Sequence, residues 1–301
     1  MRVCGQANCV FLMADRIFAS MARRGIPHLA RGTFVWDTIC LMRTLRGIFL
    51  LLSLAGCAAS SYNVGTERQE TLLISTEREI ALGESVSKQV EKEFNVIRDP
   101  KLLEQVDRVG ARLVAVTDRK ELSYRFTIVE PKEGEDQPNA FALPGGPIYV
   151  TGALLKLTHS DDELASVLAH EMGHVTAKHT IKQLQGAMGM QLLQILAVGT
   201  GAADARTSAG MDLAFTSLFL EYSQGDELQA DRLGVKYAKL AGYNPGAAIT
   251  FMERLRDHTL KEPSRNFSYF RTHPYFADRI RLLRQESQGH ITFDDYINRK
   301  Q

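Results

Sequence analysis

The sequence has little cysteine, little tryptophan and no long hydrophobic run. Four cysteines and one tryptophan occur in 301 residues, which is too few for the disulfide framework of small secreted domains. An apolar stretch from Gly47 to Cys57 has about half of the roughly twenty residues that a membrane-spanning helix needs. The 36 Lys+Arg nearly balance the 35 Asp+Glu. A nucleic-acid-binding protein would show a basic excess, so we expect no nucleic-acid partner.

The composition is that of an ordinary globular protein. Hydrophobic residues make up 45% of the chain and charged residues 24%. This balance supports one or two domains with a sizeable core and excludes a disordered or fibrous chain.

The apolar stretch directly follows Arg43 and Arg46, and it ends in Leu-Ala-Gly-Cys at Cys57. A basic segment followed by a short apolar segment is typical of a secretory signal. The last four residues resemble the lipobox of bacterial lipoproteins, in which the cysteine is acylated and becomes the first residue of the mature chain. The alternative is a buried helix that happens to end in Ala-Gly-Cys; the basic flank and the order of the small residues favour the lipobox. We therefore predict export and a membrane anchor at Cys57.

Patterning in the rest of the chain predicts an α+β fold, with several helices packed on a small sheet. Alternating and β-branched residues predict strands over 124–130 and within 140–150, the latter broken at Pro144-Gly145-Gly146. Thr76 with Glu79 predicts a capping box, and Asp99-Pro100 predicts a second helix start. Later helices are expected over about 160–184, 226–241, 247–258 and 277–286. The glycine-rich stretch 186–210 carries no readable role.

One motif carries clear chemistry, namely His170-Glu171-Met172-Gly173-His174, which has the pattern HExxH. Two histidines four residues apart on a helix share one face, so both rings can reach one metal ion. Zinc accepts imidazole ligands and, in catalytic sites, keeps one position for water. Glu171 would then be the general base that takes the proton from this water. We predict one Zn²⁺ per chain.

An HExxH pattern also arises by chance, and chance copies lie mostly on solvated helix faces. Here the motif follows a capped amphipathic segment in a chain with an export signal, which favours the zinc site. A suitable acidic segment, Glu227-Leu228-Gln229-Ala230-Asp231, occurs downstream.

HEMGH followed by this E-x-Q-A-D segment resembles metallopeptidase family forty-eight, which includes the CAAX prenyl proteases, the mitochondrial inner-membrane stress protease and bacterial periplasmic lipoproteins. The segment from Asn139 to Gly146 (NAFALPGG) and a late His273-Pro274 add to the resemblance. The resemblance covers about residues 75–285. It implies a mostly helical, gluzincin-like zincin with a small β-sheet beside the HExxH helix.

Carried over by position, the first acid of E-x-Q-A-D is the third zinc ligand, which is Glu227. Asp231 would accept the free ring N–H of a zinc histidine, namely His170; the alternative is a surface residue without a role. His179 lies five residues beyond His174 and is expected to point elsewhere, as a neighbour of the site or a surface residue.

The resemblance also suggests a place for the substrate. The strand formed by Asn139, Ala140, Phe141 and Ala142 would be the edge strand on which a peptide lies, although a plain core hairpin is nearly as good an interpretation. His273 would be catalytic as a donor to the oxyanion, or would occlude the zinc in a resting state, or would be a simple turn residue. Arg279 is a weaker candidate for the oxyanion role.

Taken together, these patterns predict a zinc metalloendopeptidase, lipid-anchored at the periplasmic face of a bacterial membrane, with the outer membrane favoured. Its partners would be polypeptides, in particular misfolded envelope proteins. A non-hydrolytic chaperone using the same cleft is the alternative, and a purely structural zinc site ranks last. The predicted segments are an extension before the true start at Met42 (1–41), a lipoprotein signal peptide (42–56), a lipid-anchored tether (57–75) and the zinc metallopeptidase domain (76–301).

Overall fold

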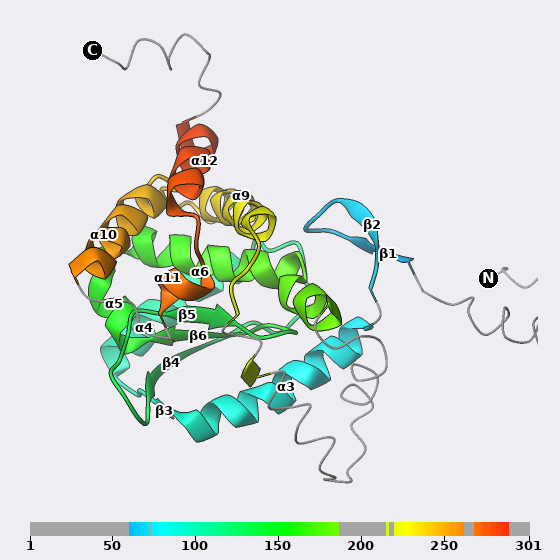
Figure 1. The fold of residues 1–301 in the computed structure, drawn as a ribbon, viewed down its shortest axis with the longest axis horizontal. Helices are drawn as coiled ribbons and strands as arrows, with labels where there is room; N and C mark the ends of the chain where they lie inside the picture. Colours follow the sequence, from blue (N-terminus) through cyan, green and yellow to red (C-terminus); the bar gives the residue numbers. More distant parts are fainter. Residues whose placement is uncertain (1–59, 73, 187–214, 217–219, 262–267, 289–301) are drawn as a thin grey trace, which may run out of the picture. The chain divides into compact units, whose positions relative to one another are not determined.

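A computed structural model describes residues 60–72, 74–186, 215–216, 220–261 and 268–288. The predicted extension, the signal peptide and Cys57 lie outside the described residues, as does nearly all of the glycine-rich stretch. The described part is an α+β fold in which helices enclose a small mixed sheet (Figure 1). The predicted fold class is confirmed.

The sheet has four strands in the order β3-β4-β6-β5. Strand β4 is parallel to β6, whereas β3 and β5 are antiparallel to their neighbours. The turn between β5 and β6 uses Gly145 and Gly146, whose φ values of 77° and 118° suit glycine alone. The strand bounds are β3 Phe94–Val96, β4 Arg125–Pro131, β5 Ala140–Ala142 and β6 Pro147–Thr151.

The two faces of the sheet bury different sets of side chains. Ile148 and Val150 on β6 pack into the core shared with the helices α4 (Pro100–Val114) and α6 (Asp161–Thr176). Tyr149, between them, points to the other face and packs under α3 (Thr76–Glu93). This alternation is what a strand buried on both faces requires. Figure 1 shows α3 and α6 on opposite sides of the sheet.

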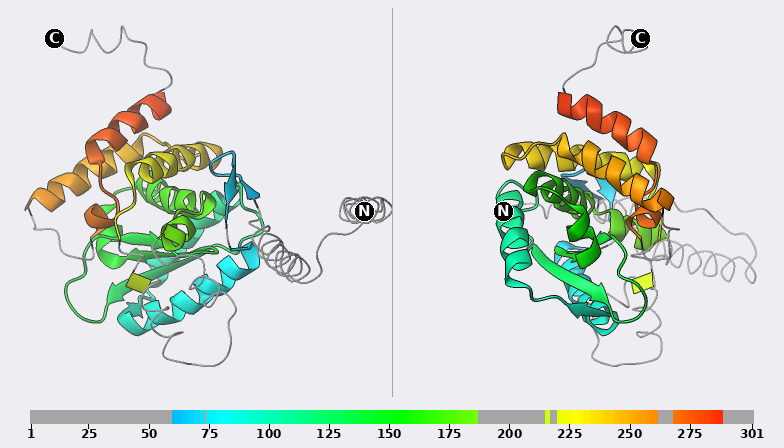
Figure 2. Two further views of the ribbon diagram at one scale, coloured as in Figure 1. Left: turned by 45° about the vertical axis from the view of Figure 1, so that its right-hand side comes forward. Right: turned by 90° about the vertical axis from the view of Figure 1, so that its left-hand side faces the viewer.

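The helix α6 lies centrally among the helices and packs against α4, α9, α10 and strand β5 (Figure 2). Ser160 caps its N-terminus by accepting a hydrogen bond from the Glu163 N–H. Ser223 caps α9 in the same way through the Asp226 N–H. The remaining helices are α5 Gly152–Leu157, α9 Gln224–Leu240, α10 Ala247–Lys261, α11 Tyr269–Thr272 and α12 Phe276–Gln288.

The start of α3 differs from the prediction. Ser75, rather than Thr76, is the N-cap. Glu79 makes no capping box, because its carboxylate turns inward to the buried guanidinium of Arg119 at 2.7 Å and 3.0 Å. A buried charge needs such a partner, so packing overrides the local capping pattern.

A second difference lies in the range predicted as a tether. The strands β1 (Ser60–Asn63) and β2 (Arg68–Thr71) form a two-stranded antiparallel hairpin. Asn63 ties this hairpin to the domain by donating a hydrogen bond from Nδ2 to the Ala177 carbonyl at 3.0 Å. Polar side chains of this segment, such as Asn63, make these contacts. The segment boundaries themselves stay predictions.

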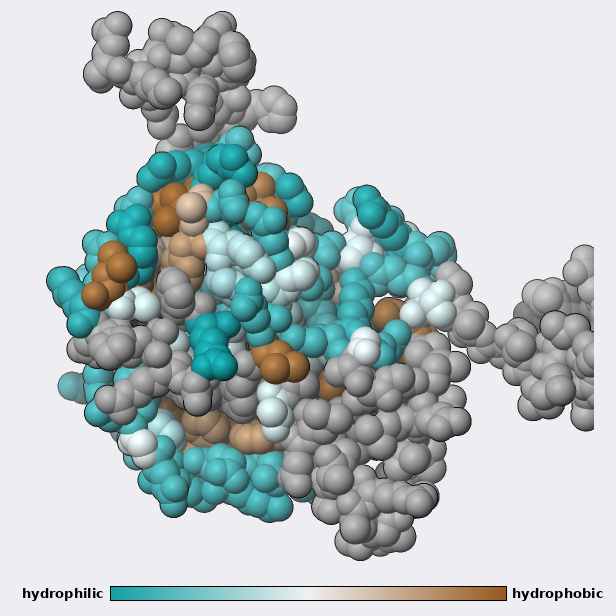
Figure 3. All heavy atoms as spheres, in the orientation of Figure 1, coloured by the Kyte–Doolittle hydropathy of each residue, from teal (hydrophilic) through white to brown (hydrophobic). Residues whose placement is uncertain are grey.

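Hydrophilic side chains cover most of the surface of α3 and of the hairpin in the view of Figure 3, and hydrophobic residues form small separate groups between them. Within the described ranges, none of the helices is both long and apolar enough to cross a membrane.

Candidate metal centre

The site depends on a close approach between α6 and α9, which two glycines allow. A Cβ atom on Gly173 would lie 2.8 Å from the Ala230 carbonyl oxygen, and one on Gly234 would lie 3.2 Å from the His170 nitrogen. Both contacts are to backbone atoms, which cannot move away without shifting a whole helix. The glycine in HEMGH therefore allows the acidic face of α9 to reach the histidine face of α6.

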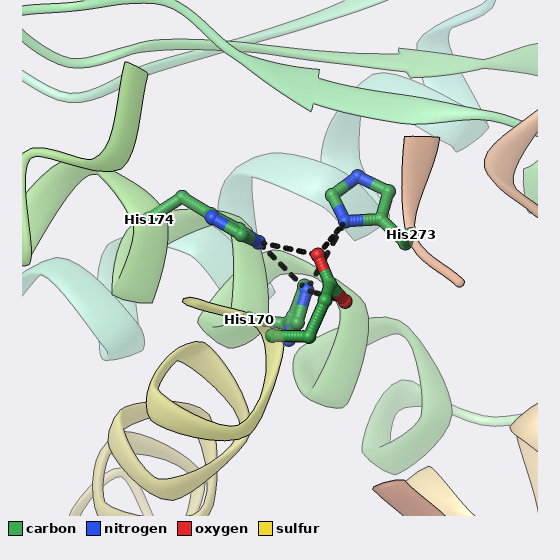
Figure 4. A group of neighbouring side chains, drawn as sticks. His170, His174 and His273 are labelled. Atoms are coloured by element: carbon green, nitrogen blue, oxygen red, sulfur yellow. Dashed lines mark hydrogen bonds and ion pairs between the residues drawn. The ribbon is translucent and has the colours of Figure 1, made fainter. Parts of the chain in front are cut away.

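Four side chains from three parts of the chain meet at this contact (Figure 4). The Nε2 atoms of His170 and His174 lie 3.0 Å apart. The Glu227 carboxylate faces both of them, with Oε1 at 3.4 Å from His174 Nε2 and Oε2 at 3.5 Å from His170 Nε2. His273 Nδ1 completes the group at 2.9 Å from Glu227 Oε1 and 3.4 Å from His170 Nε2. One potential ligand atom from each of the four residues lies within 4.8 Å of the others.

This spacing fits a metal ion. Two ligand atoms bound at 2.0–2.1 Å to a tetrahedral centre lie about 3.3 Å apart. The distances above scatter around that value. Imidazole nitrogen and carboxylate oxygen are also the ligand types that zinc shares with several transition metals. The predicted ligands His170, His174 and Glu227 are thus brought together, and all three are buried.

Asp231 and Arg279 support the His170 side of the cluster. Asp231 Oδ1 lies 2.9 Å from His170 Nδ1, so this nitrogen can donate a proton to it and leave Nε2 free for a ligand. The Arg279 guanidinium binds Asp231 at 2.8 Å and Glu227 at 2.7 Å. It is therefore committed to two carboxylates, which argues against the oxyanion role considered for it. No local pattern in the sequence predicts this contact.

The electrostatics of the cluster favour a cation. Burial alone would raise the pKa of Glu227 and Asp231, but Arg279 holds both below their usual values. Burial and Arg279 likewise act to lower the pKa of His170, yet Asp231 and Glu227 outweigh them and raise it to about 9. Positive charge at His170, as a proton or as a metal ion, is thus stabilised by two ionised carboxylates.

The His174 side contains two further neighbours, Tyr222, which the sequence analysis missed, and His179, for which it left a place beside the site as one alternative. Tyr222 stacks on the His174 ring with 4.0 Å between centroids. His179 does not point elsewhere, because its Nδ1 lies 2.9 Å from His174 Nδ1. Our expectation assumed one continuous helix, but α6 ends at Thr176 and Lys178 has a left-handed φ of 57°. A new helical segment over 179–186 then starts in another direction.

Glu171 lies beside the cluster rather than in it. Its Oε1 is 3.5 Å from His273 Nε2 and makes no hydrogen bond within the described part of the chain. Burial raises the pKa of this carboxyl group. A buried acceptor without a donor, next to a metal cluster, is suited to bind and deprotonate a water molecule.

His273 reaches the cluster from the C-terminal end of α11, where it is the C-cap residue. Tyr269 stacks on its ring at 4.3 Å and holds it over the site. The backbone carbonyl of His273 also accepts a hydrogen bond from Arg279 Nη1 at 3.3 Å. The histidine is therefore fixed by packing as well as by the carboxylate of Glu227.

Strand β5 pairs with β6 alone in the described sheet and forms its edge. Thr151 N donates to Asn139 O, and Leu143 N donates to Pro147 O. In an antiparallel pair the residues alternate, so the backbone groups of Ala140 and Ala142 point away from β6, although both residues are buried. Both amide atoms of the Asn139 side chain are buried without a hydrogen-bond partner in the described residues.

The model of Peptidase family M48 matches residues 100–287. The chain belongs to this peptidase family. The predicted resemblance, and with it the prediction of a hydrolase of the metalloprotease class, is confirmed at the level of the M48 family.

Individual M48 relatives match most of the chain. The beta-barrel assembly-enhancing protease of Yersinia pestis is 32% identical over 72% of this chain and 45% of its own length. The protein of the same name from Escherichia coli K12 is 30% identical over the same shares. The mitochondrial metalloendopeptidase OMA1 of Schizosaccharomyces pombe is 29% identical over 60% of this chain and 51% of its own. The chain thus spans about half the length of the curated relatives it matches.

Proposed function

We propose that this chain is a zinc-dependent endopeptidase that hydrolyses peptide bonds with an activated water molecule. The observation that carries the proposal is the convergence of His170, His174 and Glu227, with the buried carboxylate of Glu171 beside them, whose Oε1 makes no hydrogen bond within the described residues. Membership of family M48 supports the same reaction class.

The zinc ion would be held by His170, His174 and Glu227, with Asp231 fixing the His170 ring. When bound, zinc supplies a Lewis acid that polarises the scissile carbonyl and lowers the pKa of the attacking water. Glu171 takes the proton from that water and passes it to the leaving amine. Burial raises the pKa of the Glu171 carboxyl group, which makes its carboxylate a stronger proton acceptor.

The peptide would lie along β5 as an added strand. The outward backbone groups of Ala140 and Ala142 would pair with it, and the Asn139 amide would bind its main chain. Phe141 faces the core under α3, so its part is to keep the strand in place. Recognition through main-chain groups predicts little preference for side-chain sequence.

His273 has two possible roles, and its position favours one. Its Nδ1 lies among the ligand atoms, and with zinc bound it would compete for the position that a catalytic zinc keeps for water. This supports an occluded resting state from which His273 must withdraw. A donor to the oxyanion is the alternative.

The His273→Ala variant separates these roles. Occlusion alone predicts unchanged or higher kcat, since a blocking ligand is removed. Loss of an oxyanion donor predicts a fall in kcat of about 10²- to 10³-fold. Steady-state kinetics on a quenched peptide, with zinc content measured alongside, distinguishes the two.

Glu171→Gln tests the function itself. The amide keeps the shape of the side chain but cannot take a proton, so we expect about one zinc per chain and a loss of kcat of about 10²- to 10⁴-fold. Cleavage of casein or of a quenched peptide library, with and without chelator, is the measurement. Glu91→Gln, an exposed change on α3, is the matched control. Proteolysis by Glu171→Gln at the wild-type rate would refute the mechanism.

Two alternative functions, a chaperone and a structural zinc site, predict that the wild-type protein shows no chelator-sensitive cleavage. A chaperone would use the same cleft to hold polypeptides, and a structural zinc would be closed by His273 as a fourth ligand. Neither explains why a buried carboxylate, with one oxygen that makes no hydrogen bond in the described residues, lies beside the cluster, so both rank below the peptidase.

We further propose that the protein is a lipoprotein of the bacterial envelope, anchored through Cys57. Substrates would be misfolded envelope or outer-membrane proteins, in line with relatives named beta-barrel assembly-enhancing protease. The anchor is tested with Cys57→Ser, which should abolish labelling by a palmitate analogue; persistent labelling would contradict it.

A further inference from the structure

Hydrogen bonds connect the candidate ligand His174 to the β1–β2 hairpin. The ring of His174 turns Nε2 to the metal cluster (Figure 4) and Nδ1 to His179 Nδ1 at 2.9 Å. On the far side of that second ring, His179 Nε2 lies 2.9 Å from Gln229 Oε1. Gln229 Nε2 then donates to the carbonyl oxygen of Gly65 at 3.0 Å. Three side chains and one backbone group form this connection, which we call the His174 relay.

The direction of the relay is set at its outer end. The Gly65 carbonyl can only accept a hydrogen bond, so the amide nitrogen of Gln229 must face it. Consequently Gln229 presents its oxygen, again an acceptor, to His179 Nε2. Asp226 Oδ1, at 3.4 Å, is a second acceptor facing the same ring nitrogen. His179 Nε2 must therefore carry a proton.

The same reasoning continues to the metal cluster. With its proton on Nε2, a neutral His179 has a lone pair on Nδ1 and accepts from His174 Nδ1. His174 then carries its proton on Nδ1 and has a lone pair on Nε2. That is the tautomer a metal ligand needs, and the opposite direction of the relay would place a proton where the metal binds.

Backbone geometry holds the relay in place. Lys178, with its left-handed φ of 57°, turns the chain so that His179 meets His174 although five residues separate them. Gly65 approaches the end of α6 so closely that a Cβ atom there would lie 2.7 Å from the Ala177 Cα. The hairpin is thus seated against the end of the motif helix, with its carbonyl aimed at Gln229.

We propose that His179 and Gln229 are positioning residues that fix the tautomer and orientation of His174, and that the Gly65 carbonyl sets the direction of the relay. The inference rests on the metal site of the proposed function, but it concerns metal binding and proton position rather than cleavage. It assigns a purpose to the hairpin, which otherwise contributes no side chain to the cluster.

Proton positions are measured directly by long-range ¹H–¹⁵N NMR of the histidine rings in the full, zinc-loaded chain. The relay predicts a proton on Nε2 of His179 and on Nδ1 of His174. A proton on Nδ1 of His179 would overturn the proposal, whether or not the protein cleaves peptides. This readout needs no variant, so failure of a variant to fold does not affect it.

Zinc affinity, from competition with a graded chelator, tests the role of Gln229. Gln229→Ala should weaken zinc binding about tenfold, at the lower end of what indirect supports contribute. Gln229→Glu should restore affinity to within about twofold of wild type, because a carboxylate still accepts from His179 Nε2–H. Arg232→Gln, an exposed change on the same helix, should have no effect. Equal losses for the alanine and glutamate variants would show a merely structural role and overturn the proposal.

The role of the Gly65 carbonyl is tested by comparing Gly65→Ala in the wild-type chain with Gly65→Ala in the Gln229→Glu variant. Gly65→Ala displaces the Gly65 carbonyl. The side chain of Gln229 can then rotate and place its amide nitrogen next to His179. In the Gln229→Glu variant the carboxylate has no N–H group, so the same rotation changes nothing. Gly65→Ala should therefore weaken zinc binding several-fold with Gln229 present and leave it unchanged in Gln229→Glu. Val64→Ala, a partly exposed neighbour, is the control. If Gly65→Ala weakened zinc binding equally in both cases, the Gly65 carbonyl would not set the direction of the relay, and this part of the proposal would be wrong.

Discussion

The two histidines of the motif are supported in opposite ways. The outer nitrogen of His170 faces a charged group, the carboxylate of Asp231, which is itself held by Arg279. The outer nitrogen of His174 faces neutral groups, the ring of His179 and then the amide of Gln229. Both arrangements leave Nε2 free, one through electrostatic attraction and the other through the fixed direction of hydrogen bonds.

The difference follows from the charges already buried at the site. Glu171, Glu227 and Asp231 are all buried, with Arg279 as the cation that touches two of them. A further carboxylate in direct contact with His174 Nδ1 would add like charge to this group and would need a partner of its own. A neutral relay avoids that cost, but it depends on geometry, and hence on the turn at Lys178 and the position of Gly65.

The largest expected effect comes from removing both supports. Each support acts on a different histidine and they share no side chain, so their contributions should be independent. Asp231→Asn combined with Gln229→Ala should weaken zinc binding by the product of the single effects, about 100- to 1,000-fold. Chelator competition on the two single variants and the combined one gives the comparison. A combined loss no greater than the larger single loss would show that the two sides are one support.

Removing the charged support alone should have a smaller effect. Asp231→Asn keeps an oxygen for His170 Nδ1–H but loses the charge, and leaves Arg279 with Glu227 as its only strong partner. We expect zinc affinity to fall about 10- to 100-fold, as is typical for residues behind a metal ligand. A smaller loss of zinc affinity for Asp231→Asn than for Gln229→Ala would show that the neutral support of His174 contributes more than the charged support of His170, which would contradict this order.

Helix packing beneath both supports is tested by adding one methyl group. Gly173→Ala would press a Cβ against the Ala230 carbonyl at 2.8 Å, so α6 and α9 must separate. We expect the free energy of unfolding to fall by about 1–3 kcal/mol, less the roughly 1 kcal/mol that alanine contributes to helix propensity. Gly234→Ala, with its nearest backbone atom at 3.2 Å, should be close to neutral. Urea unfolding of the metal-free proteins measures both, and a larger loss for Gly234→Ala would contradict the packing account.

The parts of the site that the sequence predicted are those with local periodicity. His170 and His174, and likewise Glu227 and Asp231, are four residues apart on single helices, which is enough to place each pair on one face. The same logic failed for His179, because a left-handed residue interrupts the helix before it.

Contacts distant in sequence could not be predicted from one chain. Gln229 and Gly65 are 164 residues apart, and Arg279 and Asp231 are 48 apart. No local pattern announces either contact, since each depends on how elements pack in three dimensions. For the same reason Ser75 replaces Thr76 as the cap of α3, because the burial of Glu79 against Arg119 decides the first turn.

The central claim is that Glu227, rather than a neighbouring acid, completes the metal site with the two histidines. Asp226 is adjacent in sequence but is bound to Ser223 at the N-terminus of α9, with a half-buried side chain. The direct measurement is zinc content after dialysis against a graded chelator, for Glu227→Ala and Asp226→Ala side by side. The account predicts that Glu227→Ala loses its zinc at concentrations of chelator that leave wild type loaded, while Asp226→Ala stays close to wild type. Retention of zinc by Glu227→Ala together with its loss from Asp226→Ala would contradict the assignment.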